Sequence, residues 1–163
     1  MPNRLFLCLA LSLGGSLAGA NEVAPITTLV GEAYDLESNE LLYTENHTFA
    51  YDADGRLIGD EVIYLYPDGT KLGSKTLDFG PSLFLPNFRT TLDNSGYVEG
   101  LSRDGDKLVL LRQEVGEKEP REKRIDKDDC DAGDAGFHPY VQANLDELSS
   151  GDTVKFRFCA AGN

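Results

Sequence analysis

The sequence has few of the residues on which recognisable catalytic and metal centres are built. It contains no tryptophan, one methionine, three cysteines and two histidines, His47 and His138. No H-E-x-x-H zinc motif and no G-x-S-x-G nucleophile motif occurs after residue 20. With so few histidines, a zinc centre or a nucleophilic triad has little to draw on. The sequence therefore predicts no catalytic, cofactor-binding or metal-binding residue, and no cofactor.

Basic residues are also scarce. Lysine and arginine total 15 against 28 aspartate and glutamate residues, so the formal net charge is −13. A surface this acidic repels nucleic acid and anionic membranes, which argues against partners of those classes. The carboxylates are spread along the chain, and the closely spaced groups at 52–55 and 128–134 do not complete a calcium-ligand set. This acidity is typical of a solvated, soluble surface.

The longest apolar run lies at the N-terminus. It extends from Leu5 to Leu17, after the basic side chain of Arg4, and small residues follow it up to Ala20. The run is shorter than the roughly 20 apolar residues that span a bilayer, and the segment has the three parts of a secretory signal peptide. We therefore expect residues 1–20 to be removed. The product would be an exported protein of the periplasm or extracellular space, without a membrane span.

Two cysteines, Cys130 and Cys159, follow the predicted signal peptide. An exported protein meets an oxidising compartment in which such a pair can close, so a disulfide is favoured over two free thiols. A loop of about 30 residues would stabilise the fold by roughly 3 to 4 kcal/mol in the entropic model. The bond would be structural, since the two residues do not form a C-x-x-C redox motif.

Residues 21–163 have the length of a single domain. Strand-forming residues and turn signals predict a mainly β (α+β) fold, an antiparallel meander that could curve into a half-barrel. A D-G-x-x-x-G pattern at Asp54 recurs fourteen residues later at Asp68, and predicts two hairpin tips with turns of the I′ family. The predicted strands are residues 26–35, 40–51, 56–66, 71–79, 96–102 and 106–115.

Two segments interrupt the strand pattern. Residues 79–88 are apolar but contain Pro81 and Pro86, which exclude a regular central strand. This segment either tucks its leucine and phenylalanine side chains into the core or forms a hydrophobic lid or docking segment. Residues 116–134 are rich in charge and short of apolar residues, which predicts an exposed charged loop.

Near the C-terminus the apolar periodicity changes to that of a helix. Val141, Leu145 and Leu148 fall on one stripe, Pro139 suits the first helical turn and Gly151 suits the C-terminal cap. The sequence therefore predicts one amphipathic helix in this part of the chain.

The segment 153–159 follows that helix and reads as a strand. Val154, Phe156 and Phe158 alternate with basic residues, which predicts one buried face. A strand of this kind belongs inside a sheet, yet too few residues follow it to build a neighbour. We therefore expect an incomplete domain with an unpaired sheet edge and an exposed apolar patch.

Three stretches together resemble a family of uncharacterised exported proteins of Gram-negative bacteria. They are G-E-A-Y-D from Gly31, K-T-L-D-F from Lys75, and D-A-G-F from Asp134, the last followed by L-x-x-G and an F-x-F strand. The resemblance covers most of the chain after the signal peptide and implies an envelope location and a strand-rich fold. It implies no activity, cofactor or site residue. Members of that family continue beyond the F-x-F strand, whereas this chain ends soon after it.

Three functions are compatible with these features. The first is a non-catalytic envelope or periplasmic module that binds an apolar small molecule or an envelope protein on the concave side of a curved sheet. The second is a hydrolase or isomerase whose acid and base are carboxylates such as Asp60, Glu61 or Asp78. The third is a purely structural, or truncated and inactive, protein. A deep apolar cavity would favour the first, and two carboxylates of opposed pKa in one cleft would favour the second.

Overall fold

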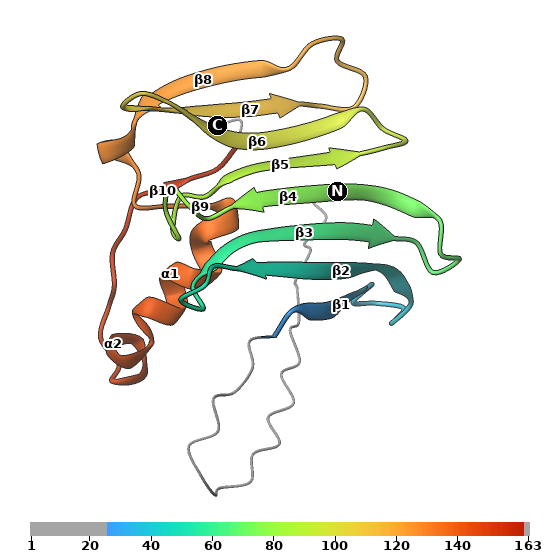
Figure 1. Cartoon of the computed structure of the whole chain (residues 1–163). Helices are drawn as coiled ribbons and strands as arrows, with labels where there is room; N and C mark the ends of the chain where they lie inside the picture. Colours follow the sequence, from blue (N-terminus) through green and yellow to red (C-terminus); the bar gives the residue numbers. More distant parts are fainter. Residues whose placement is uncertain (1–25, 162–163) are drawn as a thin grey trace, which may run out of the picture.

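The computed structural model describes residues 26–161, and the predicted signal peptide lies outside them. Eight antiparallel strands follow one another in chain order in a single open, curved sheet (Figure 1). This confirms the predicted β meander. The strands are β1 (Thr28–Tyr34), β2 (Leu41–Tyr51), β3 (Leu57–Leu65), β4 (Lys71–Asp78), β5 (Asn87–Leu92), β6 (Tyr97–Asp104), β7 (Lys107–Gln113) and β8 (Arg121–Asp126).

The two D-G hairpin tips are present, but their turn type differs from the predicted one. Asp52 N–H donates to Arg56 O and Gly55 N–H donates to Asp52 O, at 2.9 and 3.1 Å. Gly55 has a φ of 76° and Gly69, at the second tip, 82°, while Asn39 is the sole non-glycine residue with positive φ in the described chain. An I′ turn needs positive φ at two positions, so each tip is instead a type I turn closed by a left-handed glycine.

The apolar segment before β5 packs into the core, which was one of its two predicted roles. Phe79 and Leu85 are each 8% exposed and Pro86 is fully buried, although Leu83 remains 43% exposed. β5 begins directly after Pro86 and was not among the predicted strands. A proline there is tolerated because it precedes the first ladder hydrogen bond of the strand.

The prediction of a loop over the whole of 116–134 is wrong, because this segment contains β8. The strand pairs with β7 and forms one edge of the sheet. Its side chains are nearly all exposed, and Lys107 on β7 reaches Asp126 at 2.7 Å. Charged residues on both faces are a common protection of an edge strand, so a low apolar content here does not exclude a strand.

The predicted helix is present as two short helices, α1 (Phe137–Ala143) and α2 (Leu145–Ser149). Asn144 separates them, and its side chain donates to Tyr140 O at 2.7 Å, in competition with the helical backbone pattern. Gly151 caps α2 as predicted, with a φ of 89°. Its N–H donates to Leu148 O, and the next N–H to Glu147 O, which together form a Schellman motif. In the described chain, neither helix is long and apolar enough to cross a bilayer.

The predicted strand over 153–159 is largely irregular. Within it, β10 (Phe158–Cys159) pairs in parallel with β9 (Ala132–Gly133), and Phe158 is 47% exposed. Phe156 packs on Tyr140 of α1, with ring centroids 4.8 Å apart, and not into the large sheet. The alternation of apolar residues therefore reflects packing against the helix. Whether the domain is incomplete stays a prediction.

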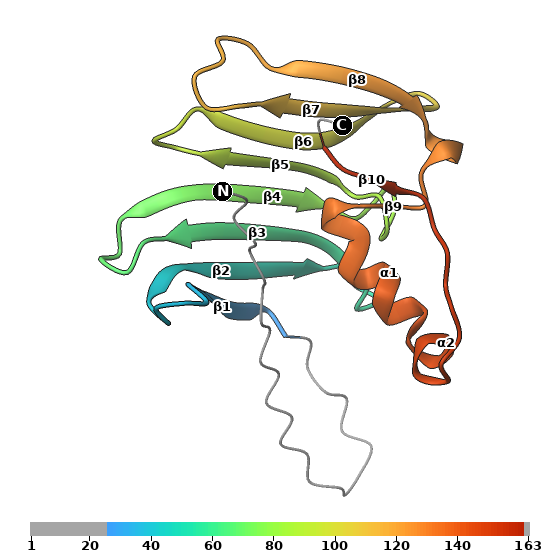
Figure 2. The same ribbon diagram turned by 180° about the vertical axis from the view of Figure 1, so that it is seen from behind.

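The chain that follows β8, residues 127–161, is called the C-terminal segment. It lies over one end of one face of the sheet, and we call this face the inner face (Figure 2). The apolar core forms between this segment, the loop before β5, and strands β5 to β7. Leu108 is completely buried and Leu101 is 2% exposed. The buried core residues are Leu85, Phe88, Leu101, Leu108, Leu110, Cys130 and Ala161.

Candidate functional site: the polar row of the inner face

The strand register divides the inner face into rows of side chains that cross the sheet. Residues paired across antiparallel strands point to the same face. One line of partners, the apolar row, contains mostly core side chains: Phe49, Asp60, Leu77, Phe88, Leu101 and Leu110. The line two residues along each strand, the polar row, is of a different character: His47, Val62, Lys75, Thr90, Glu99 and Arg112.

His47 on β2 lies between two carboxylates at one end of the polar row. Its Nδ1 is 2.8 Å from Asp60 Oδ2 on β3, and its Nε2 is 3.4 Å from Glu45 Oε2 on its own strand. The three side chains are 19%, 6% and 17% exposed, respectively. The Phe49 ring stacks on the imidazole at 5.6 Å. The strand period of two places Glu45, His47 and Phe49 on one face.

These carboxylates control the protonation of His47. The hydrogen bond to Asp60 and then that to Glu45 raise the pKa of His47 to about 9, against the opposing effect of burial. The ring is therefore an imidazolium at neutral pH, with both N–H groups donated to carboxylates. Such a ring has no free lone pair with which to accept a proton or bind a metal. It serves as a fixed cation that holds two neighbouring strands in register.

Three tyrosines border the polar row. Tyr43 and Tyr64 meet edge to face with centroids 6.0 Å apart. Burial, and then the negative charge of Glu45, raise the pKa of Tyr64. Tyr97 donates to Glu99 at 2.8 Å, and burial and this hydrogen bond raise its pKa to about 12. All three phenols are therefore neutral hydroxyls at physiological pH, suited to hydrogen bonding and ring packing rather than to proton abstraction.

The other end of the polar row is joined to the C-terminal segment. Arg112 pairs with Glu114 at 2.7 Å and also donates to Ala161 O at 3.3 Å. The N–H of Ala161 donates to Asp134 at 2.8 Å, and burial raises the pKa of that carboxyl group. The C-terminal segment thus touches the polar row at β7 and is tied to it by hydrogen bonds.

Several groups in the middle of the inner face have hydrogen-bonding capacity that the described residues leave unused. Asp60 Oδ1 and Thr90 Oγ1 are buried and have no hydrogen-bond partner within residues 26–161. The Lys75 ammonium lies 4.9 Å from the centre of the Phe88 ring and forms no ion pair with a described carboxylate. Buried polar atoms are normally satisfied, so these groups indicate where a further hydrogen-bonding partner would fit.

The carboxylates predicted for acid-base catalysis do not converge. Asp60 belongs to the inner face, whereas Glu61, the next residue on the strand, points to the opposite face and is exposed. Asp78 accepts from Gly80 N–H and from the Asn87 amide near the end of β4. The partner of Asp60 is instead His47, which Glu45 also contacts, and neither of these residues was among the predicted catalytic groups. The strand pairing set by the Asp54-Gly55 hairpin could have predicted this contact. It places His47 opposite Val62, which is two residues from Asp60 and on the same face.

Among residues 26–161, no deep apolar cavity accompanies these side chains. Two shallow hollows, of about 180 and 270 Å³, are each open to solvent. The smaller is lined by Leu110, Lys123, Ile125, Phe158, Cys159 and Ala160. Within residues 26–161, no three His, Cys, Asp or Glu side chains are grouped to hold a metal ion. Both hollows are thus open depressions rather than enclosed pockets.

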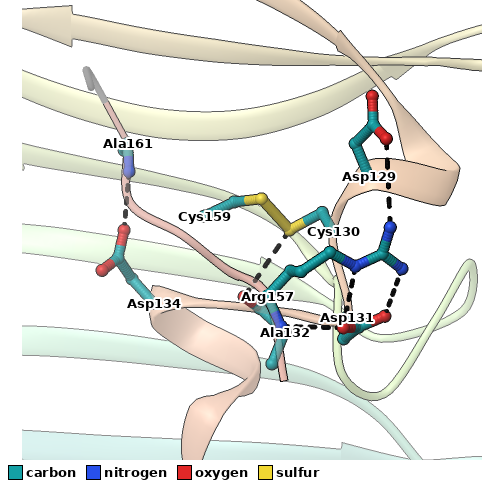
Figure 3. The surroundings of a disulfide bond; sticks show 8 residues. All are labelled: Asp129, Cys130, Asp131, Ala132, Asp134, Arg157, Cys159 and Ala161. Atoms are coloured by element: carbon teal, nitrogen blue, oxygen red, sulfur yellow. Dashed lines mark hydrogen bonds and ion pairs between the residues drawn. A yellow bond between two sulfur atoms is a disulfide. The ribbon is translucent and has the colours of Figure 1, made fainter. Parts of the chain in front are cut away.

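The predicted disulfide joins the C-terminal segment to the chain that follows β8 (Figure 3). Cys130 and Cys159 are bonded, with Cα atoms 5.9 Å apart, within the range expected for a disulfide. Beside them, Arg157 forms an ion pair with Asp131 at 2.6 Å, and Asp131 also accepts from the Arg157 backbone N–H at 2.7 Å. This cross-link holds the cover of the apolar row in place.

Comparisons with known proteins add no family to these observations. No family model matches the chain, and no curated protein and no solved structure matches it at a significant level. The resemblance to exported Gram-negative proteins therefore stays a prediction.

Proposed function

We propose that the protein is a non-catalytic binding or accessory module of the cell envelope, and that its ligand lies along the polar row of the inner face. One observation carries the proposal: the polar row combines internally paired charges with unused hydrogen-bonding groups on a face that the C-terminal segment covers at one end only. If the face served stability alone, we would expect apolar side chains at the positions of the polar row as well, because unpartnered buried polar atoms cost free energy.

The chemistry of the row favours a neutral, polyhydroxylated ligand such as an oligosaccharide. The charges of His47 and Arg112 are already balanced by neighbouring carboxylates, which leaves Lys75 as the one cation of the row without an ion pair among the described residues. Hydroxyl groups both donate and accept, and so they could pair with the Lys75 ammonium and, where neighbouring side chains move aside, with the buried oxygens of Thr90 and Asp60. Tyrosine rings add flat apolar surfaces beside these polar groups.

The shape of the hollows also bears on the ligand. Small apolar molecules are usually held in concave pockets that bury most of their surface. Because the two hollows are shallow, the geometry favours an extended polar ligand over the apolar small molecule considered from the sequence. The predicted signal peptide and the Cys130–Cys159 bond both support placing this module in an oxidising, exported compartment.

Amide chemical-shift mapping with chitohexaose, a neutral oligosaccharide, tests the proposal. We expect saturable shifts at His47, Lys75, Thr90 and Tyr97, weakened in Lys75→Met. Lys71→Met is the matched control, since Lys71 lies on the same strand but pairs with Asp93 at the hairpin end.

Native mass spectrometry of protein purified from its own envelope complements this titration, because it reports any ligand that is retained. Shifts confined to the other face, or a retained apolar lipid, would overturn the proposal. So would the absence of any bound or retained molecule.

A further inference from the structure

The two edge strands of the sheet differ in how they are protected. β8 exposes four consecutive charged side chains from Arg121 to Arg124, a common defence against pairing with another chain. β1 has a single charged residue, Glu32. Its apolar side chains are exposed, with Val30 at 61% and Tyr34 at 42%. β1 is therefore the edge at which a further strand can add.

The register of β1 on β2 shows which of its peptide groups are free. Phe49 N–H donates to Thr27 O at 2.9 Å, so the peptide groups of Thr27 point toward β2. Because these directions alternate along an antiparallel strand, the groups of Thr28, Val30 and Glu32 point away from β2. No strand of residues 26–161 pairs with them. Three N–H groups and three C=O groups thus form an unused ladder.

We propose that β1 pairs in antiparallel orientation with β1 of a second copy of this chain, about a two-fold axis at Val30. A β-bulge between Ala33 and Tyr34 ends the regular part of the strand. The regular, outward-facing stretch is therefore Thr28 to Glu32, and its centre is Val30. Pairing about this centre lets all three outward residues exchange hydrogen bonds with their counterparts.

The charge pattern of β1 fits this occupant. In the two-fold register, Glu32 lies opposite Thr28 of the second copy, so the one charged residue of each strand meets a neutral hydroxyl and not a like charge. Val30 of one copy meets Val30 of the other on the outer face, continuous with Ile63, which is 39% exposed two strands away. An isologous contact of this kind closes after two copies.

Pairing of β1 with β8 of the next copy is the main structural alternative. It would extend without limit, since each added copy would leave one β1 and one β8 edge free. Two of the three basic side chains of β8 are also engaged already, as Arg124 pairs with Asp104 and Arg121 with Glu117. The two-fold pair would instead place both inner faces on the same side of one continuous sheet.

Sedimentation velocity of the purified protein over a concentration series tests this inference. We expect a monomer–dimer equilibrium that strengthens with salt, because the net charge of −13 opposes association and salt screens it. Val30→Lys should weaken dimerisation by about tenfold or more, since it places two like charges opposite each other. Ile63→Lys, on the same face but away from the edge, is the matched control and should dimerise like the wild type.

A cross-linking variant gives a second readout that does not depend on loss of association. Val30→Cys should form an intermolecular disulfide under mild oxidation, whereas Thr48→Cys, on the same face of β2, should not. A protein that stays monomeric at all concentrations would overturn the inference. So would open-ended growth, or a dimer that Val30→Lys leaves intact. These outcomes do not depend on whether the polar row binds a saccharide.

Discussion

The apolar row and the polar row lie two residues apart on the same strands, yet the molecule uses them differently. The apolar row is buried under the C-terminal segment and fastened by the Cys130–Cys159 bond. The polar row holds an imidazolium between two carboxylates and leaves Thr90 Oγ1 without a partner. Side chains two residues apart on a strand point to the same face, so one face of this sheet carries both an apolar row and a row of polar and charged side chains.

Removal of the disulfide should have the largest effect on the apolar row. For Cys130→Ala combined with Cys159→Ala, we expect the free energy of unfolding to fall by about 3.5 kcal/mol, because the loop between the cysteines is no longer closed in the unfolded chain. Urea denaturation of the oxidised wild type and of the variant measures this loss. A loss below about 1 kcal/mol would mean that the cover of the apolar row is held by packing alone.

Truncation of a core side chain should come next. Leu108 is 0% exposed, and Leu108→Ala should cost about 3 kcal/mol through lost burial and an unfilled cavity. Leu36→Ala is the control, since Leu36 is 67% exposed and its truncation should change the stability by less than about 0.5 kcal/mol. Equal effects at the two positions, measured by urea denaturation, would break the distinction between the packed core and its surroundings.

The His47 network should make stability depend on pH. Its folded pKa of about 9 lies above the unfolded value of 6.5, so the native state binds the extra proton between these values. The contribution is therefore complete below about pH 6.5 and is lost as the pH rises through about 9. His47→Gln should reduce stability at pH 6.5 by on the order of 1 to 2 kcal/mol, and the difference should shrink toward pH 9.5.

Unfolding curves of both proteins at several pH values provide the measurement for His47. A difference between wild type and His47→Gln that stays constant across this window, or that grows with pH, would show that His47 contributes through packing and not through charge.

The smallest effect on stability should come from Thr90→Val. This change removes a buried hydroxyl without a partner among the described residues and keeps the side-chain shape, so the unliganded protein should be unchanged or slightly more stable, within about 1 kcal/mol. Binding of chitohexaose should nevertheless weaken, because the hydroxyl is offered to the ligand. Thr91→Val, on the opposite face, is the control and should leave binding unaltered. A large loss of stability in Thr90→Val would indicate a structural role for the hydroxyl.

The local pattern predicted the strands of the meander well where turns were marked by Asp-Gly. It missed β5 and β8 for different physical reasons. Pro86 obscured the start of β5, and the charge of β8 suits an edge strand as well as a loop. The alternation at Phe156 and Phe158 was misread because packing against a short helix produces the same pattern as a strand face.

The candidate site was harder to predict because it depends on register between strands. Asp60 was considered together with its sequence neighbour Glu61, although adjacent strand residues face opposite ways. Its true partner, His47, lies on the preceding strand beside Glu45 and comes within reach through the hairpin at Asp54-Gly55. The positions of these residues in the sequence do not reveal the contact. The pairing of β2 with β3, worked out from the position of the turn, would have revealed it.

Titration of the imidazole resonances by NMR tests the central claim most directly. The claim is that the polar row is a preorganised charged surface anchored by His47, and the chain has just two histidines to assign, with His138 exposed on α1. We predict an apparent pKa of about 9 for His47, lowered by Asp60→Asn, which removes the carboxylate that contributes most. A midpoint at or below 6.5 for His47 in the wild-type protein would contradict the account.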